Sequence, residues 1–127
     1  MDAEHTFAVH FRDDNPHALE RLGVYEHALA LTALIDTVIE KAEARFFVKD
    51  LLDKNSTMIA MHVAQAGGEL GKSERRKHYR VARRAATNCA AMLDILARRP
   101  NADPDLLGPA KAAVGTLIGR LAHLAVK

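Results

Sequence analysis

The residues of this chain best suited to chemistry are cations gathered in one short block. Between residues 72 and 84 the sequence reads KSERRKHYRVARR, in which seven of thirteen residues are Lys or Arg and one, Glu74, is acidic. Arginine binds phosphate through two parallel hydrogen bonds, and clustered cations raise both the affinity for a polyanion and its salt dependence. This basic block is therefore the candidate nucleic-acid site, and its members are Lys72, Arg75, Arg76, Lys77, Arg80, Arg83 and Arg84.

The rest of the chain has the opposite charge. Outside the basic block there are 11 Lys or Arg residues and 15 Asp or Glu residues, which is a net charge of −4. The overall charge of +2 conceals this asymmetry. The protein is mildly acidic with one basic segment, and that segment favours an anionic partner.

No other group of residues predicts catalysis. Cys89 is the only thiol, and it falls on an apolar helical line, where a cysteine acts as a small inert hydrophobe. The seven His residues show no paired spacing on one helical face, and no Glu-x-x-His motif of a carboxylate-bridged metal bundle occurs. The stretch AGGELGKSE lacks the spacing of a phosphate-binding loop and follows a predicted helix instead of a strand. We expect no enzymatic activity, no metal and no cofactor.

Length and composition predict one soluble domain. The chain has 127 residues, 49% of them apolar and 27% charged, and no apolar run approaches the roughly 18 residues that cross a bilayer. The first residues, MDAEHTFAVHFRDD, carry acids where a secretory signal carries positive charge. A single cysteine suits a reducing compartment. We expect a cytoplasmic protein without membrane contact.

The elements that position the basic block are predicted to be helices. Ala and Leu dominate, and strand signals are scarce. Because the connections are short, we expect an all-α fold, an up-down-up-down antiparallel four-helix bundle over residues 15–127. The first helix runs from about Pro16, capped by Asn15, to Glu43; the second from Arg45 to Ala66, ending at Gly67-Gly68; the third from near Lys72 to just before Pro100; and the fourth from Asp103-Pro104 to about Ala125.

Each predicted helix has one apolar line, with steps of three and four residues. Asn55 and His62 interrupt the second line, and burying either without a partner would cost roughly 1 to 3 kcal/mol. They are expected to hydrogen-bond across the core or to face a subunit contact. The lines are Val24, Ala28, Leu31, Ile35, Val38 and Ala42; Val48, Leu52, Asn55, Ile59, His62 and Ala66; Tyr79, Ala82, Ala86, Cys89, Leu93 and Leu96; and Leu107, Ala110, Val114, Leu117, Leu121 and Leu124.

Two further features have more than one interpretation. Residues 1–14 precede the bundle, and their TFAVHF stretch alternates apolar and other residues, as in a short strand, an arm packed on a neighbour, or a frayed tail. The fourth helix has a strip of small residues, which indicates either close approach of another helix, within or between subunits, or tolerated drift. The strip comprises Gly108, Ala112, Gly115, Gly119 and Ala122.

On a helical wheel, five cations of the basic block lie opposite the apolar line of the third helix, while Tyr79 points inward. A solvated face would explain their position, but like charges four residues apart repel by roughly 0.2 to 0.5 kcal/mol per pair. Acids such as Asp50, Asp53 or Glu69, or a polyanion, would compensate that repulsion. We call these five residues the basic stripe: Arg76, Lys77, Arg80, Arg83 and Arg84.

Three stretches carry a resemblance to a known family: VYEHALAL in the first helix, MIAMHVAQAGGE in the second and HYRVARRAATNCAAMLD in the third. Over residues 24–125 the chain resembles the small bacterial four-helix bundle proteins first noted as products of intervening sequences in ribosomal RNA genes, and the related accessory variability proteins of diversity-generating retroelements. It departs from them at residues 62–66, where HVAQA replaces an Asn-Ile-Ala-Glu-Gly pattern, and in lacking acids after Ala82-Arg83.

The resemblance implies a homo-oligomer, commonly a pentamer, whose basic surface binds a reverse transcriptase and nucleic acid through Arg76, Arg80, Arg83 and Arg84. Together with the basic block, it predicts a non-catalytic oligomeric helical adaptor that binds RNA, DNA or a nucleoprotein. The alternative is a structural or protein-interaction oligomer without a nucleic-acid role, whose stripe is neutralised by its own subunits.

Overall fold

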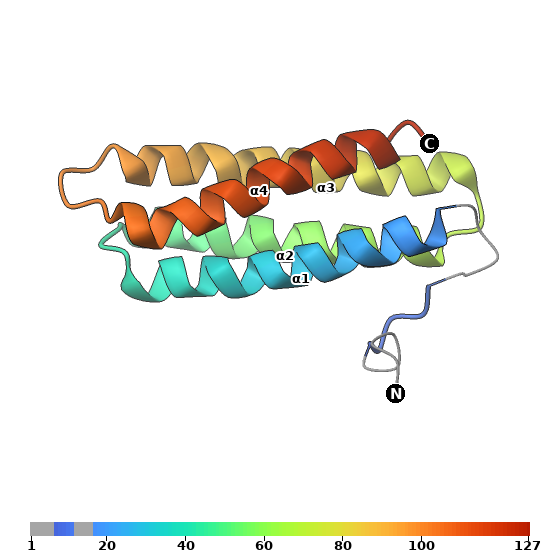
Figure 1. Cartoon of the computed structure of the whole chain (residues 1–127), viewed down its shortest axis with the longest axis horizontal. Helices are drawn as coiled ribbons and strands as arrows, with labels where there is room; N and C mark the ends of the chain where they lie inside the picture. Colours follow the sequence, from blue (N-terminus) through green and yellow to red (C-terminus); the bar gives the residue numbers. More distant parts are fainter. Residues whose placement is uncertain (1–6, 12–16) are drawn as a thin grey trace.

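The protein folds into four long helices that lie side by side (Figure 1). The computed structural model describes residues 7–11 and 17–127. The helices are α1 (Ala18–Lys41), α2 (Phe46–Gly68), α3 (Lys72–Ala97) and α4 (Pro104–Leu124). The described ranges contain no strand, which confirms the all-α prediction.

Each helix packs against two neighbours, so that α1 contacts α2 and α4, and α3 contacts α2 and α4. The α1–α2 and α3–α4 connections lie at one end of the molecule, and the α2–α3 connection lies at the other (Figure 1). The predicted lines of α3 and α4 are buried throughout, and those of α1 and α2 are buried over most of their length. Helical periodicity therefore identified the core, since one face of each helix faces the bundle axis.

The helix ends follow local chemistry with two differences from prediction. The side chain of Asp103 caps α4 by accepting a hydrogen bond from the Asp105 amide at 3.0 Å, and the proline at 104 occupies the first helical position. The second helix ends at the Gly67-Gly68 pair as predicted, but it includes both glycines and so extends two residues beyond Ala66. The helix α1 begins at Ala18, after His17 in a left-handed conformation, while the predicted cap Asn15 lies outside the described residues.

Residues 7–11 form an irregular arm that packs against α1 and α2. The rings of Phe7 and Phe11 contact Tyr25 of α1, with centroids 5.4 and 5.1 Å away. The ring of Phe11 also lies against Gly67 of α2, where an added Cβ would come within 2.3 Å of it. Only glycine leaves room for this contact, so Gly67 has a packing role besides its place near a helix end. Residues 1–6 and 12–16 lie outside the described residues.

The small-residue strip of α4 does not contact another helix of this chain. A Cβ added at Gly108, Gly115 or Gly119 would meet nothing within 4 Å. The expectation of close approach inside the subunit is therefore wrong. Contact between subunits and tolerated drift remain the two interpretations of the strip.

One helix, α1, is long and apolar enough to pass a length and composition test for a membrane span. This differs from the expectation that no segment approaches that length. The core helix of a soluble protein passes the same test, and α1 contributes Val24, Leu31 and Ile35 to the bundle core without exposing them. The test therefore does not decide between the two.

Candidate nucleic-acid interface

The third helix places the basic stripe on the outer surface of the bundle. Arg80, Arg83 and Arg84 are exposed, while Ala82 and Ala86 on the opposite side are fully buried. Lys72 and Lys77 are also exposed, and Arg76 is half-buried. The stripe therefore faces solvent because the other face of the same helix forms the core.

Arg75 is placed differently from the other cations of the basic block. Its side chain is 8% exposed, and its guanidinium donates hydrogen bonds to the carbonyls of Glu69 at 3.5 Å and Leu70 at 3.3 Å. These bonds tie α3 to the connection that precedes it. Arg75 thus lies inside the bundle, away from the surface at which a phosphate chain would bind.

The three exposed arginines of the stripe have no acidic partner within the part of the chain that the structure describes. Lys77 pairs with Glu74 at 3.2 Å, and Arg76 donates to the carbonyl of Val126 at 3.2 Å. The acids considered as compensating partners lie elsewhere or are engaged. Asp50 pairs with Lys54 at 3.0 Å, Glu69 lies 3.8 Å from His78, and Asp53 makes no ion pair with the stripe.

A shallow hollow lies at one end of the exposed stripe, between α3 and α4. Its walls combine two guanidiniums with a hydroxyl, an amide and one apolar side chain. Such donors can contact phosphate and sugar oxygens, whereas the bases would find no aromatic platform because Tyr79 is buried. The lining residues are Arg83, Arg84, Thr87, Asn88 and Ile118.

Two hydrogen-bonded polar pairs join α2 to α3. Asn88 donates to the side-chain oxygen of Asn55 at 3.1 Å, and the Nδ1 atoms of His62 and His78 lie 3.1 Å apart. The prediction that Asn55 and His62 find partners across the helix contact is confirmed. Asn88 and His78 were not identified from the sequence. Aligning the two predicted helices as antiparallel neighbours would have placed Asn88 near Asn55 and His78 near His62.

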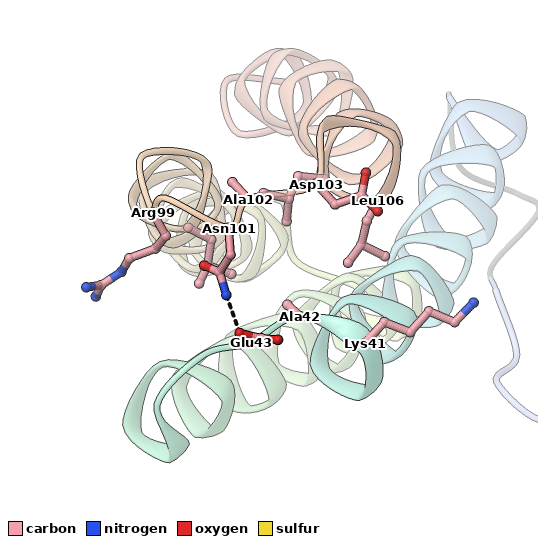
Figure 2. A pocket seen from close by; sticks show the side chains of 10 residues that line it. Lys41, Ala42, Glu43, Arg99, Asn101, Ala102, Asp103 and Leu106 are labelled. Atoms are coloured by element: carbon pink, nitrogen blue, oxygen red, sulfur yellow. Dashed lines mark hydrogen bonds between the residues drawn. The ribbon is translucent and has the colours of Figure 1, made fainter.

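A pocket at the opposite end of the molecule does not resemble a catalytic site. It has a volume of about 170 Å³, below the roughly 300 Å³ usual for ligand sites. Asn101 donates a hydrogen bond to Glu43 across it, while Lys41 and Arg99 point away from it in opposite directions (Figure 2). Its charged groups therefore do not converge on a common point.

The remaining candidates for chemistry are also unreactive in this fold. Cys89 is fully buried, and burial raises the pKa of its thiol to about 12, so the nucleophilic thiolate is scarce at neutral pH. Within residues 7–11 and 17–127 no group of three His, Cys, Asp or Glu side chains is arranged to hold a metal ion. The described surface thus offers cations as its main functional groups.

Comparisons with known proteins identify no relative of this chain. No family model matches it. No curated protein and no solved structure matches it either. Its function is therefore inferred from its residues and their geometry.

Proposed function

We propose that the protein is a non-catalytic, oligomeric helical adaptor of the cytoplasm that binds RNA or a nucleoprotein through the basic stripe of α3. The observation that carries this proposal is that Arg80, Arg83 and Arg84 are exposed and lack acidic partners among the described residues. Uncompensated like charges along one helix face cost free energy, and a polyanion removes that cost. The contacts are to the phosphate backbone, so binding depends weakly on sequence and strongly on salt.

The proposal includes an up-down-up-down arrangement of the helices. Residues 98–103 form the longest connection, and six extended residues span about 21 Å, less than the roughly 31 Å length of a 21-residue helix such as α4. A chain with such connections has to turn back after each helix. Along the α2–α3 contact, Asn55 meets Asn88 and His62 meets His78. Residue numbers therefore rise along α2 where they fall along α3, as expected for antiparallel helices.

Charge reversal tests the nucleic-acid proposal with a matched control just beyond the end of the same helix. The variant R80E/R84E changes two exposed arginines of the stripe, and R98E/R99E makes the same change at two exposed arginines at the other end. We expect R80E/R84E to weaken binding to single-stranded RNA and to lower the slope of log affinity against log salt by about 1 to 2. The control variant should retain the wild-type slope. Equal losses of RNA affinity in both variants would show that only net charge matters and would refute the stripe as the binding site.

The second candidate function is self-association through protein contacts alone. It is favoured by large apolar side chains exposed on α2: Phe46 at 83%, Phe47 at 70% and Met61 at 54%. Exposed apolar side chains of this size are typical of a surface that contacts another protein. In this case the acids of one copy would neutralise the stripe of the next.

Light scattering separates the two candidates. If R80E/R84E changes the mass in solution and leaves RNA affinity unchanged, the stripe is an assembly contact and the nucleic-acid proposal fails. If the mass is unchanged and RNA affinity falls, the assembly-only alternative fails. The double substitution F47S/M61S should lower the mass without changing the affinity of the remaining subunits for RNA, because these side chains lie on α2.

A further inference from the structure

Three polar side chains are buried where α1 and α3 begin. Arg21 of α1 is only 4% exposed, Tyr79 of α3 is 1% exposed and Arg75 is 8% exposed. Burial raises the pKa of Tyr79 to about 12, and the positive charges of Arg21 and Arg75 are near enough to counter part of that rise, so the three polar ends are neighbours. A pair of guanidiniums and a phenol therefore share one buried region, a composition that burial alone disfavours.

The only hydrogen-bond acceptor in this cluster is the hydroxyl of Tyr79, and the cluster contains no carboxylate. The hydroxyl of Tyr79 lies close enough to Arg21 to act on its pKa, but neither that hydroxyl nor the Nε and Nη1 atoms of Arg21 has a hydrogen-bond partner of good geometry in the described part of the chain, and all three atoms are buried. Burial, and then the nearby positive charge of Arg75, lower the pKa of Arg21. Since an unpaired buried cation is destabilising, the cluster would be stabilised by a negative group that accepts hydrogen bonds.

The nearest carboxylate is already engaged. Glu20 precedes Arg21 in α1, and its two oxygens lie 3.3 Å from the Nδ1 of His17 and 3.2 Å from the Nε2 of His123. Arg75 in turn donates to the carbonyls of Glu69 and Leu70. Among the described residues, no acid forms an ion pair with Arg21.

We propose that Arg21, Arg75 and Tyr79 form a binding site for a tetrahedral oxyanion of the phosphate class, separate from the exposed stripe. A single guanidinium is enough to saturate a planar carboxylate with two parallel hydrogen bonds. Two guanidiniums and a phenol come from two helices and together offer more donors than a planar carboxylate accepts, which suits the oxygens of a tetrahedral phosphate. If the ligand is larger than free phosphate, this site would bind its terminal phosphate, because an internal phosphodiester cannot enter a buried position.

The arm at residues 7–11 provides the route of entry. The unpaired atoms of Arg21 and Tyr79 are closed to solvent, so a neighbouring element has to move before an anion can reach them. The arm belongs to no helix and packs on Tyr25, one helical turn from Arg21 on the same face of α1. The anion enters when this arm lifts away from α1.

Thermal unfolding of the full chain at constant ionic strength tests the site, with inorganic phosphate, acetate and chloride compared. We expect phosphate at about ten times its dissociation constant to raise the melting temperature by about 5 °C, and acetate and chloride to have no such effect. The variant R21M should abolish the shift, and R80M, which removes an exposed arginine from α3, should retain it. Y79F removes only the unpartnered hydroxyl, so it should fold normally and reduce the shift.

The alternative outcomes are decisive. An equal shift with acetate would show a carboxylate site, and a shift lost in R80M but kept in R21M would place the phosphate on the stripe; either result overturns the proposal. If R21M does not fold, an unchanged shift in Y79F overturns it, as does the absence of any shift in the wild type. The RNA assay of R80E/R84E is a separate measurement, so either proposal can fail while the other stands. A 5′-phosphorylated oligonucleotide that competes with inorganic phosphate for the Arg21 site would identify a nucleic-acid end as its source.

Discussion

The Nδ1 atoms of His62 and His78 face each other at 3.1 Å across the contact between α2 and α3. A hydrogen bond at this distance requires one nitrogen to carry a proton and the other to present its lone pair. The other nitrogen of His78 lies 3.8 Å from Glu69. Protonation of both rings removes the acceptor and replaces the bond with repulsion.

This pair makes stability depend on pH. Burial, and then the proximity of His78, lower the pKa of His62 below its ordinary value of 6.5, so the unfolded chain binds more protons below that pH. The contribution of neutral His62 to the free energy of unfolding is therefore fully present above about pH 6.5 and is lost as the pH falls through the folded-state pKa of this residue. We expect the urea midpoint of H62Q to vary less with pH than that of the wild type. The same substitution at exposed His10 should leave the pH profile unchanged, and identical profiles for H62Q and the wild type would contradict this coupling.

The bond between Asn55 and Asn88 predicts a measurable coupling energy. Asn55 is 9% exposed, and N88A leaves its side-chain oxygen without a donor, at a cost of about 1 kcal/mol in the free energy of unfolding. The double-mutant cycle with N55A and N88A should give an interaction energy of about 0.5 to 1.5 kcal/mol. Additive effects of the two substitutions would show that the pair is not formed in solution.

The adjacent glycines of α2 should respond in opposite ways to alanine. At Gly68 an added Cβ meets nothing within 4 Å, so G68A should stabilise the helix by up to about 1 kcal/mol. At Gly67 the Cβ overlaps the ring of Phe11, so G67A should expel the arm and increase proteolytic cleavage near residue 11. The double variant G67A/F11A should fold as stably as F11A or more so, because the overlapping ring is gone. Equal cleavage of G67A and G68A would refute this arm contact.

The small-residue strip of α4 can be tested in the same manner. An added Cβ at Gly115 or Gly119 meets no other element within 4 Å among the described residues, so each alanine should stabilise an isolated subunit by about 0.5 to 1 kcal/mol. If two subunits pack through the strip, the alanines instead separate them, and light scattering should show a lower mass. Increased stability at unchanged mass would show that the glycines have no role in assembly.

Local patterns along the chain are enough to predict the four helices and the apolar face of each, because a period of 3.6 residues is a local property. They also predict that Arg80, Arg83 and Arg84 face outward, since these residues lie opposite Ala82 and Ala86 on one helix. Neither result requires knowledge of any residue distant along the chain.

Which residues of different helices meet depends on how the helices pack in three dimensions. The pairing of His62 with His78, the burial of Arg21 beside Arg75 and the contact of Phe11 with Gly67 all join segments far apart in sequence. They depend on the axial register and rotation of neighbouring helices, and many registers satisfy the same apolar periodicity. For that reason Arg75 belonged with the basic block in the sequence but lies with Arg21 inside the folded protein.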